Sequence, residues 1–181
     1  GQAAPVRLMS LKSKVAALIG LGVDCVWCLK FADIRPMTAE AFLTQLVVGK
    51  RVKHLVVGDD FRFGCDRKGD FSYLLDMGGR QGFTVEQSET HRVGNERISS
   101  SRIRHLLKTN DFVGAAQLLG RFYALCGRVG YGQQLGRKIG FPTANITLSN
   151  EHPLRGVFGC TVELPDGQIF TGVANIGCRP T

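Results

Sequence analysis

The sequence predicts an α/β domain with a parallel sheet, followed by an all-β domain that forms a small barrel. As far as Gly120, apolar β-branched runs alternate with segments of helical periodicity, the order expected of strands joined by helical crossovers. From Phe122 onward, short strand-like runs alternate with glycine turns, and helical periodicity is weak. We therefore expect two domains, residues 1–120 and 121–181.

The elements of both domains follow from periodicity and from capping residues. Pro36 and Thr38 are typical of a helix start, and Gly20 and Gly22 of a helix end. The apolar run that ends at Gly58 reads as a strand. The expected helices are 10–21, 39–48, 70–78, the segment from the serines at 99–101 to 108, and 111–119. The expected strands are 23–31, 52–57, 82–87, 123–129, 143–148, 157–164 and 168–174.

Composition and net charge limit the kinds of protein that this sequence can encode. Hydrophobic residues make up 44% of the 181 residues and charged residues 21%, an ordinary balance for a globular protein. No apolar run is as long as a membrane span, and no signal peptide opens the chain. The net charge of +8 is scattered along the sequence. Scattered charge favours anionic small substrates such as nucleotide phosphates over nucleic acid or a membrane.

Six cysteines occur, two of them in a C-x-x-C at Cys25 and Cys28. This spacing is compatible with zinc or redox chemistry. Here it lies inside the run expected to be a strand, and no second pair completes a metal site. We expect buried free thiols, and with them a reducing, cytoplasmic setting.

A glycine-rich stretch from Gly127 to Asn145 is the first candidate site. Glycines allow the backbone to approach a ligand closely, and exposed N–H groups in such loops bind anions. Thr143 and Asn145 are hard oxygen donors that share one face of an extended segment. Two such oxygens beside a phosphate loop suit Mg²⁺, which indicates phosphoryl transfer. A glycine-rich barrel corner with a proline turn explains the same residues equally well.

A serine-capped helix start is the second candidate site. Arg97, Ser100, Ser101 and Arg104 surround a predicted helix N-terminus, whose free N–H groups and flanking arginines suit phosphate. A plain serine cap with solvated arginines is the alternative. Residues 59–64 follow the end of a predicted parallel strand, where ligands of such sheets bind.

Several sequence blocks resemble known families. The loop that ends in Gly140-Phe-Pro-Thr-Ala-Asn145 resembles the riboflavin kinase family, as do blocks 156–159 and 172–181. Blocks 57–64 and 97–101, with Arg104, resemble signatures of an adenylyltransferase module; Ser101 stands where that family usually has Thr. Together, the blocks resemble the prokaryotic bifunctional riboflavin kinase/FMN adenylyltransferase family.

The resemblance implies two Mg²⁺-dependent reactions, riboflavin with ATP to FMN and FMN with ATP to FAD. It implies a Rossmann-like nucleotidyltransferase domain, then a six-stranded kinase barrel. The implied ligands are riboflavin, FMN, FAD and ATP, with FMN and FAD as substrate or product. It assigns Mg²⁺ to Thr143 and Asn145, and the flavin to Asp60 and Phe61. Residues implied to contact ATP or its phosphates are Arg97, Ser100, Ser101, Arg104, Gly132, Gly136, Arg137, Gly140, Thr143 and Asn145.

Two hallmarks of that family are missing from the sequence. It has no His-x-Gly-His, the nucleotidyltransferase signature, and no glutamate after Thr181 to act as the kinase base. We therefore expect a chain cut at both ends, inactive as it stands, with its catalytic residues outside it. The alternatives are a non-catalytic flavin- or nucleotide-binding regulatory module, and a nucleic-acid-binding protein whose affinity falls steeply with salt.

Overall fold

The computed structural model describes residues 5–132, 136, 140–148 and 152–177. Two compact units divide the chain, Cys25–Arg97 on the one hand and Gly1–Asp24 with Ile98–Thr181 on the other. The domain boundary expected at residue 120 stays a prediction. Within the described ranges, no helix combines the length and the apolarity that crossing a membrane requires.

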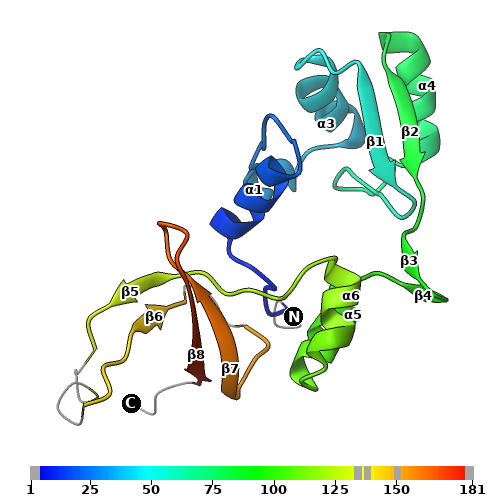
Figure 1. The fold of residues 1–181 in the computed structure, drawn as a ribbon. Coiled ribbons are helices and arrows are strands. Elements are labelled where there is room, and N and C mark those ends of the chain that lie inside the picture. Colours follow the sequence, from blue (N-terminus) through cyan, green and yellow to red (C-terminus); the bar gives the residue numbers. More distant parts are fainter. Residues whose placement is uncertain (1–4, 133–135, 137–139, 149–151, 178–181) are drawn as a thin grey trace. The chain divides into compact units, whose positions relative to one another are not determined.

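The unit Cys25–Arg97 is built around a pair of parallel strands (Figure 1). β1 (His54–Gly58) pairs with β2 (Thr84–Ser88) from His54↔Thr84 to Gly58↔Ser88, which confirms the parallel strand pair. The connection between them is α4 (Phe71–Gln81), which runs beside β2. Asp70 caps this helix by accepting a hydrogen bond from the Tyr73 N–H at 2.9 Å, and Gly82 ends it with φ 75°.

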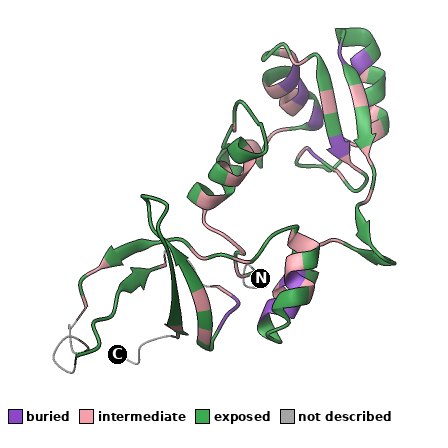
Figure 2. Ribbon diagram, viewed as in Figure 1, coloured by how far each residue is buried: buried purple, intermediate pink, exposed green. Residues whose placement is uncertain are grey.

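The core of this unit lies between the strand pair and the helices. Its buried apolar residues include Leu43 and Leu74, which are almost fully enclosed. Figure 2 shows in purple the buried positions on the helices and the strand pair of this unit. Leu43 comes from the helix expected at 39–48, which Thr38 caps as predicted. The second half of that helix winds as a π-helix: α3 (Ala39–Phe42) continues as η1 (Leu43–Val48). The remaining buried members of the core are Ala39, Val47, Val57, Phe63 and Phe83.

The strand expected at 23–31 is wrong. Residues 23–30 form neither helix nor strand, and a short helix, α2 (Phe31–Ile34), follows. An apolar run becomes a strand only where a neighbour supplies hydrogen bonds, and among the described strands β1 pairs with β2 alone. Cys25 and Cys28 are consequently exposed rather than buried, although the five described cysteines are free, as expected. The sixth, Cys178, lies outside the described residues.

The elements described in the other unit are three helices and two antiparallel strand pairs. Ser10 caps α1 (Leu11–Gly20), confirming the first predicted helix. α5 (Ser100–Lys108) and α6 (Phe112–Leu119) pack together on a core that includes Leu107 and Ala115. The strand pairs are β5 (Arg128–Gly130) with β6 (Asn145–Thr147) and β7 (Gly156–Glu163) with β8 (Ile169–Ile176). A further antiparallel pair, β3 (Arg92–Val93) with β4 (Glu96–Arg97), belongs to the unit Cys25–Arg97.

The strands of the C-terminal part are paired two by two. Among the described residues they close no barrel, so the barrel stays a prediction. β5 is much shorter than the expected strand at 123–129, since Tyr123 and Leu125 pack on the α5–α6 core instead of joining a ladder. One face of the β7–β8 hairpin exposes Val157 and Val173.

Tyr123 gives this core a measurable response to alkaline pH. Its hydroxyl is buried and has no hydrogen-bond partner among the described residues, and burial raises the pKa of Tyr123 from 10.0 to about 12. Because the folded pKa is the higher one, the unfolded state loses the phenol proton first, so stability is unaffected below pH 10 and falls as pH rises toward 12. At pH 11 we expect a loss of at most about 1.4 kcal/mol relative to a protein without this hydroxyl, reduced by solvent screening because the residue is only partly buried.

Urea unfolding of the native protein and Tyr123→Phe at pH 8 and pH 11 measures this loss. At pH 8 the variant should match or slightly exceed the native stability, because the unpaired hydroxyl is removed. The matched control is Tyr131→Phe, since Tyr131 is 100% exposed and its replacement should leave the pH dependence unchanged. Equal alkaline destabilisation of all three proteins would contradict the role given to Tyr123.

Candidate active site

One candidate site lies at the carboxyl end of the parallel strands. β1 ends at Gly58, and Asp59 and Asp60 follow in a turn that the Phe61 N–H closes by donating to the Gly58 carbonyl at 3.2 Å. Because β2 runs parallel to β1, its carboxyl end reaches the same edge of the sheet, and Thr90 follows there. This is the edge at which open α/β sheets bind ligands.

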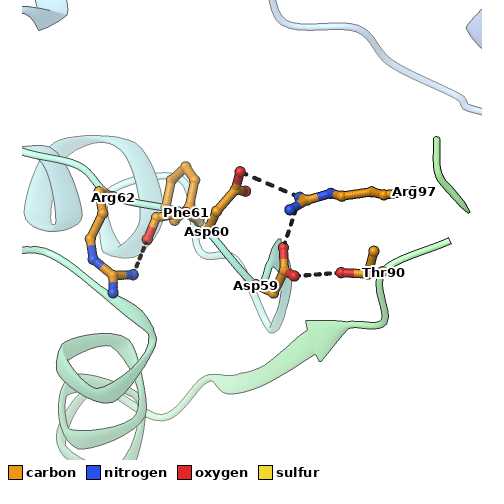
Figure 3. A network of polar contacts seen from close by, with 6 residues as sticks. All are labelled: Asp59, Asp60, Phe61, Arg62, Thr90 and Arg97. Atoms are coloured by element: carbon orange, nitrogen blue, oxygen red, sulfur yellow. Dashed lines mark hydrogen bonds and ion pairs between the residues drawn. The ribbon is translucent and has the colours of Figure 1, made fainter. Parts of the chain in front are cut away.

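A polar network joins four residues at this edge (Figure 3). The Arg97 Nη2 atom donates to Asp59 Oδ1 at 3.1 Å and to Asp60 Oδ2 at 3.4 Å. The Thr90 hydroxyl donates to Asp59 Oδ2. That hydrogen bond, assisted by the charge of Arg97 and opposed by desolvation, holds the pKa of Asp59 below its ordinary value. Asp59 therefore stays a carboxylate throughout the neutral pH range.

Phe61 connects the network to an apolar cavity. Its ring stacks against that of Phe63, with centroids 5.5 Å apart, and Phe63 is buried in the core. Arg62 Nη1 donates to the Phe61 carbonyl at 2.8 Å. An aromatic wall beside charged groups is the kind of surface that an amphipathic ring ligand needs. The cavity has a volume of about 200 Å³ and is lined by Trp27, Leu29, Phe42, Leu46, Val47, Val52, Leu55, Phe61 and Leu74.

The predicted serine-capped helix start is present as α5. Ser99 is the capping residue and accepts a hydrogen bond from the Arg102 N–H at 3.2 Å, so Ser100 and Ser101 form the first turn and are exposed. Arg104 donates from Nε to the Val6 carbonyl at 2.6 Å. Ser100, Ser101 and Arg104 belong to the unit Gly1–Asp24 with Ile98–Thr181, whereas Arg97 belongs to Cys25–Arg97.

The glycine loop forms the other candidate site. It connects β5 to β6, and Gly130 pairs with Asn145 at its base. A Cβ on Gly132 would collide with the side-chain amide of Asn145, and one on Gly136 with the Phe141 carbonyl. Gly132 and Gly136 therefore lie close to the segment 141–145 that carries Thr143 and Asn145. At position 136 the neighbour is a backbone carbonyl, so only glycine permits that approach. Gly140 has φ 82°, and Arg137 lies outside the described residues.

The donors at this loop fit a magnesium ion. Thr143 and Asn145 are exposed and offer a hydroxyl and an amide oxygen, hard neutral ligands of the type Mg²⁺ accepts together with water and phosphate. The described residues contain no group of three His, Cys, Asp or Glu side chains placed to hold a metal.

Comparison with known proteins identifies the family. The family model described as FAD synthetase matches residues 1–102, more than half of the chain. The chain belongs to the FAD synthetase family. A second model, described as riboflavin kinase, matches residues 119–181. The two matches follow each other in the order that the sequence blocks predict.

Three curated relatives of this FAD synthetase family member share one name. The protein named bifunctional riboflavin kinase/FMN adenylyltransferase in Pseudomonas fluorescens is 47% identical to this chain, over 99% of this chain and 58% of that protein. The one from Haemophilus influenzae is 44% identical, over 100% of this chain and 60% of that protein. The one from Escherichia coli K12 is also 44% identical, over 98% of this chain and 58% of that protein. The chain thus spans less than two thirds of the relatives it matches.

A solved structure is similar over the whole chain. It is described as a macrolide-efflux protein from Streptococcus pneumoniae, is 27% identical, and has a TM-score of 0.79. The similarity covers 100% of this chain and 60% of that one.

Sequence reasoning missed Thr90 and, although it placed Asp59 in the segment 59–64 at the ligand edge, it gave Asp59 no role. Roles were predicted for Asp60 and Phe61, but not for Asp59, which makes the shorter contact with Arg97, or for Thr90. Thr90 stands in a stretch without a motif. The available signal was topological, because Asp59 and Thr90 follow the carboxyl ends of two neighbouring parallel strands.

Proposed function

We propose that the complete polypeptide carries out two consecutive reactions of flavin cofactor synthesis. In the first, ATP phosphorylates riboflavin to FMN and leaves ADP. In the second, ATP transfers AMP to FMN, giving FAD and pyrophosphate. The observation that carries this proposal is the order of two family matches, FAD synthetase over residues 1–102 and riboflavin kinase over 119–181, each containing one of the candidate sites.

The adenylyltransferase reaction is proposed for the N-terminal part, with a Rossmann-like fold. Arg97 would contact ATP phosphates, since a guanidinium held at the carboxyl edge of a parallel sheet suits an anion. Ser100, Ser101 and Arg104 would add contacts from the start of α5. Asp60 and Phe61 would bind the flavin side, where an apolar cavity supports the assignment. Positioning and charge stabilisation would supply most of the rate.

The kinase reaction is proposed for the C-terminal part, with a barrel fold. Gly132, Gly136 and Gly140, with Arg137, would shape a loop against the nucleotide, and the close approach of Gly132 to Asn145 supports this. Thr143 and Asn145 would hold Mg²⁺, which, when bound, neutralises phosphate charge. The side chains themselves would orient the nucleotide so that the riboflavin hydroxyl meets the terminal phosphorus in line.

Chromatographic assay of the complete polypeptide with riboflavin, ATP and Mg²⁺ tests this proposal. We expect FMN to form first and FAD to follow, and FAD alone to form when FMN replaces riboflavin. Omission of ATP or removal of Mg²⁺ with a chelator should stop both reactions. Flavin and nucleotide binding without any turnover would contradict the proposal and support a non-catalytic regulatory module.

A further inference from the structure

Thr90 and Asp59 form a bridge between the ends of two strands. Asp59 is the residue after β1, and Thr90 lies just beyond β2. The Thr90 hydroxyl donates to one carboxylate oxygen of Asp59, Oδ2, while Arg97 occupies the other, Oδ1 (Figure 3). Each oxygen of this carboxylate thus has its own hydrogen-bond donor. The two donors together fix the plane of the carboxylate.

The two aspartates that contact Arg97 are not equivalent. The contact with Asp59 is 3.1 Å long and the contact with Asp60 is 3.4 Å. The Asp59 side chain is 41% exposed, whereas that of Asp60 is 78% exposed. Asp59 is also anchored by Thr90. Asp59 is therefore the fixed partner of the guanidinium, and Asp60 is the partner that an arriving ligand can replace.

Arg97 needs such a partner because its own element is short. β4 consists of Glu96–Arg97 and is paired only with the two residues of β3 among the described strands. A two-residue ladder fixes little of a long side chain, and an arginine side chain has about 2 kcal/mol of rotamer entropy to lose. Both carboxylates contact the same nitrogen, Nη2, so neither contact uses Nη1 or Nε.

We infer that Thr90 and Asp59 are positioning residues for FAD formation: Thr90 orients the Asp59 carboxylate, and Asp59 holds the Arg97 guanidinium ready for the phosphates of ATP. This inference rests on the proposed adenylyltransferase function. It adds that the arginine is pre-oriented in the free enzyme, by a neutral hydroxyl that itself touches no substrate. A side chain that is already oriented loses less conformational entropy when the ligand binds.

The test measures kcat and KM for FAD formation in the complete polypeptide with Thr90 replaced. Thr90→Val keeps the shape and removes the donor; we expect the KM for ATP to rise about tenfold, the effect of one hydrogen bond to a charged group, and kcat to change less. Thr90→Ser restores the hydroxyl and should recover the native KM. Asp59→Asn, which weakens both contacts, should raise the KM for ATP at least as much.

Thr84→Val is the matched control. Thr84 lies at the other end of β2, where its hydroxyl bonds His54 Nδ1 at 2.7 Å, so this variant also breaks a hydroxyl contact but lies at the opposite end of the strand from Arg97. Its FAD kinetics should be native. Urea unfolding of each variant reports whether the unit Cys25–Arg97 has folded, and riboflavin phosphorylation should be unchanged in all of them.

Combination with Arg97→Ala decides whether Thr90 acts through the arginine. In that background, Thr90→Val should have no further effect on the KM for ATP. A full additional effect there, a native KM in Thr90→Val and Asp59→Asn, or no recovery in Thr90→Ser would each overturn the inference. If the unmutated polypeptide makes no FAD, the proposed function itself has failed, an outcome that is distinct from any of these.

Discussion

Replacement of Thr143 or Asn145 by alanine is expected to abolish FMN formation from riboflavin, to less than about one hundredth of the starting rate. Each variant removes one of only two side-chain oxygens proposed to hold Mg²⁺ beside the phosphates. The folded structure should survive, because both side chains are exposed. The measurement is the initial rate of FMN production by the complete polypeptide with saturating ATP.

Two controls separate this effect from general damage. FAD formation from supplied FMN should stay near the native rate, because that reaction is assigned to the other candidate site. Thr171→Ala replaces an exposed threonine of β8, paired with Thr161, and should leave FMN formation intact. Riboflavin phosphorylation at a near-native rate in Thr143→Ala or Asn145→Ala would contradict the assignment of the metal ligands.

The second large effect is expected at the carboxyl edge of the parallel strands. Arg97→Ala should lower FAD formation about ten- to a hundredfold, because a charge-assisted phosphate contact contributes about 1.5–3 kcal/mol. Ser100→Ala should lower it in the same direction through a neutral contact of smaller energy. Neither change should affect riboflavin phosphorylation, and both reactions are to be measured on each variant.

Arg92→Ala provides the comparison for Arg97→Ala. Arg92 lies opposite Arg97 in the β3–β4 pair, and its Nη1 donates to the Asn95 carbonyl at 3.2 Å, so this variant removes an equal charge from the same hairpin without touching the aspartates. It should retain most FAD formation. A loss in Arg97→Ala that is equal for both reactions would indicate misfolding, and a loss as large in Arg92→Ala would indicate a general effect of charge.

Local rules of sequence predicted the helices of this protein well. Ser10, Thr38 and Asp111 each cap a helix within a residue or two of the expected start, because capping is decided by residues three positions apart. The parallel pairing of β1 and β2 was also predictable, since a helix of suitable length separates the two strands.

Features that depend on distant partners could not be predicted in this way. Residues 23–30 have the composition of a strand, yet pairing requires a neighbouring ladder that no local pattern specifies. Thr90 and Asp59 meet across 31 positions of sequence, and only the register of the strands brings them together. The glycine loop is intermediate, because its composition indicates close approach and the fold decides which atoms are approached.

Asp59 has one charged partner, Arg97, and one neutral partner, Thr90, so the position of Arg97 in this network should depend on ionic strength. The Arg97 side chain is 49% exposed and that of Asp60 is 78% exposed, so the attraction between them is open to screening by dissolved ions. A hydrogen bond from the neutral Thr90 hydroxyl is far less sensitive to salt. Potassium chloride should therefore release the Arg97 guanidinium from Asp60, while the Asp59 carboxylate keeps its orientation. In the ligand-free protein, the Arg97 side chain should consequently occupy different positions at low and at high ionic strength.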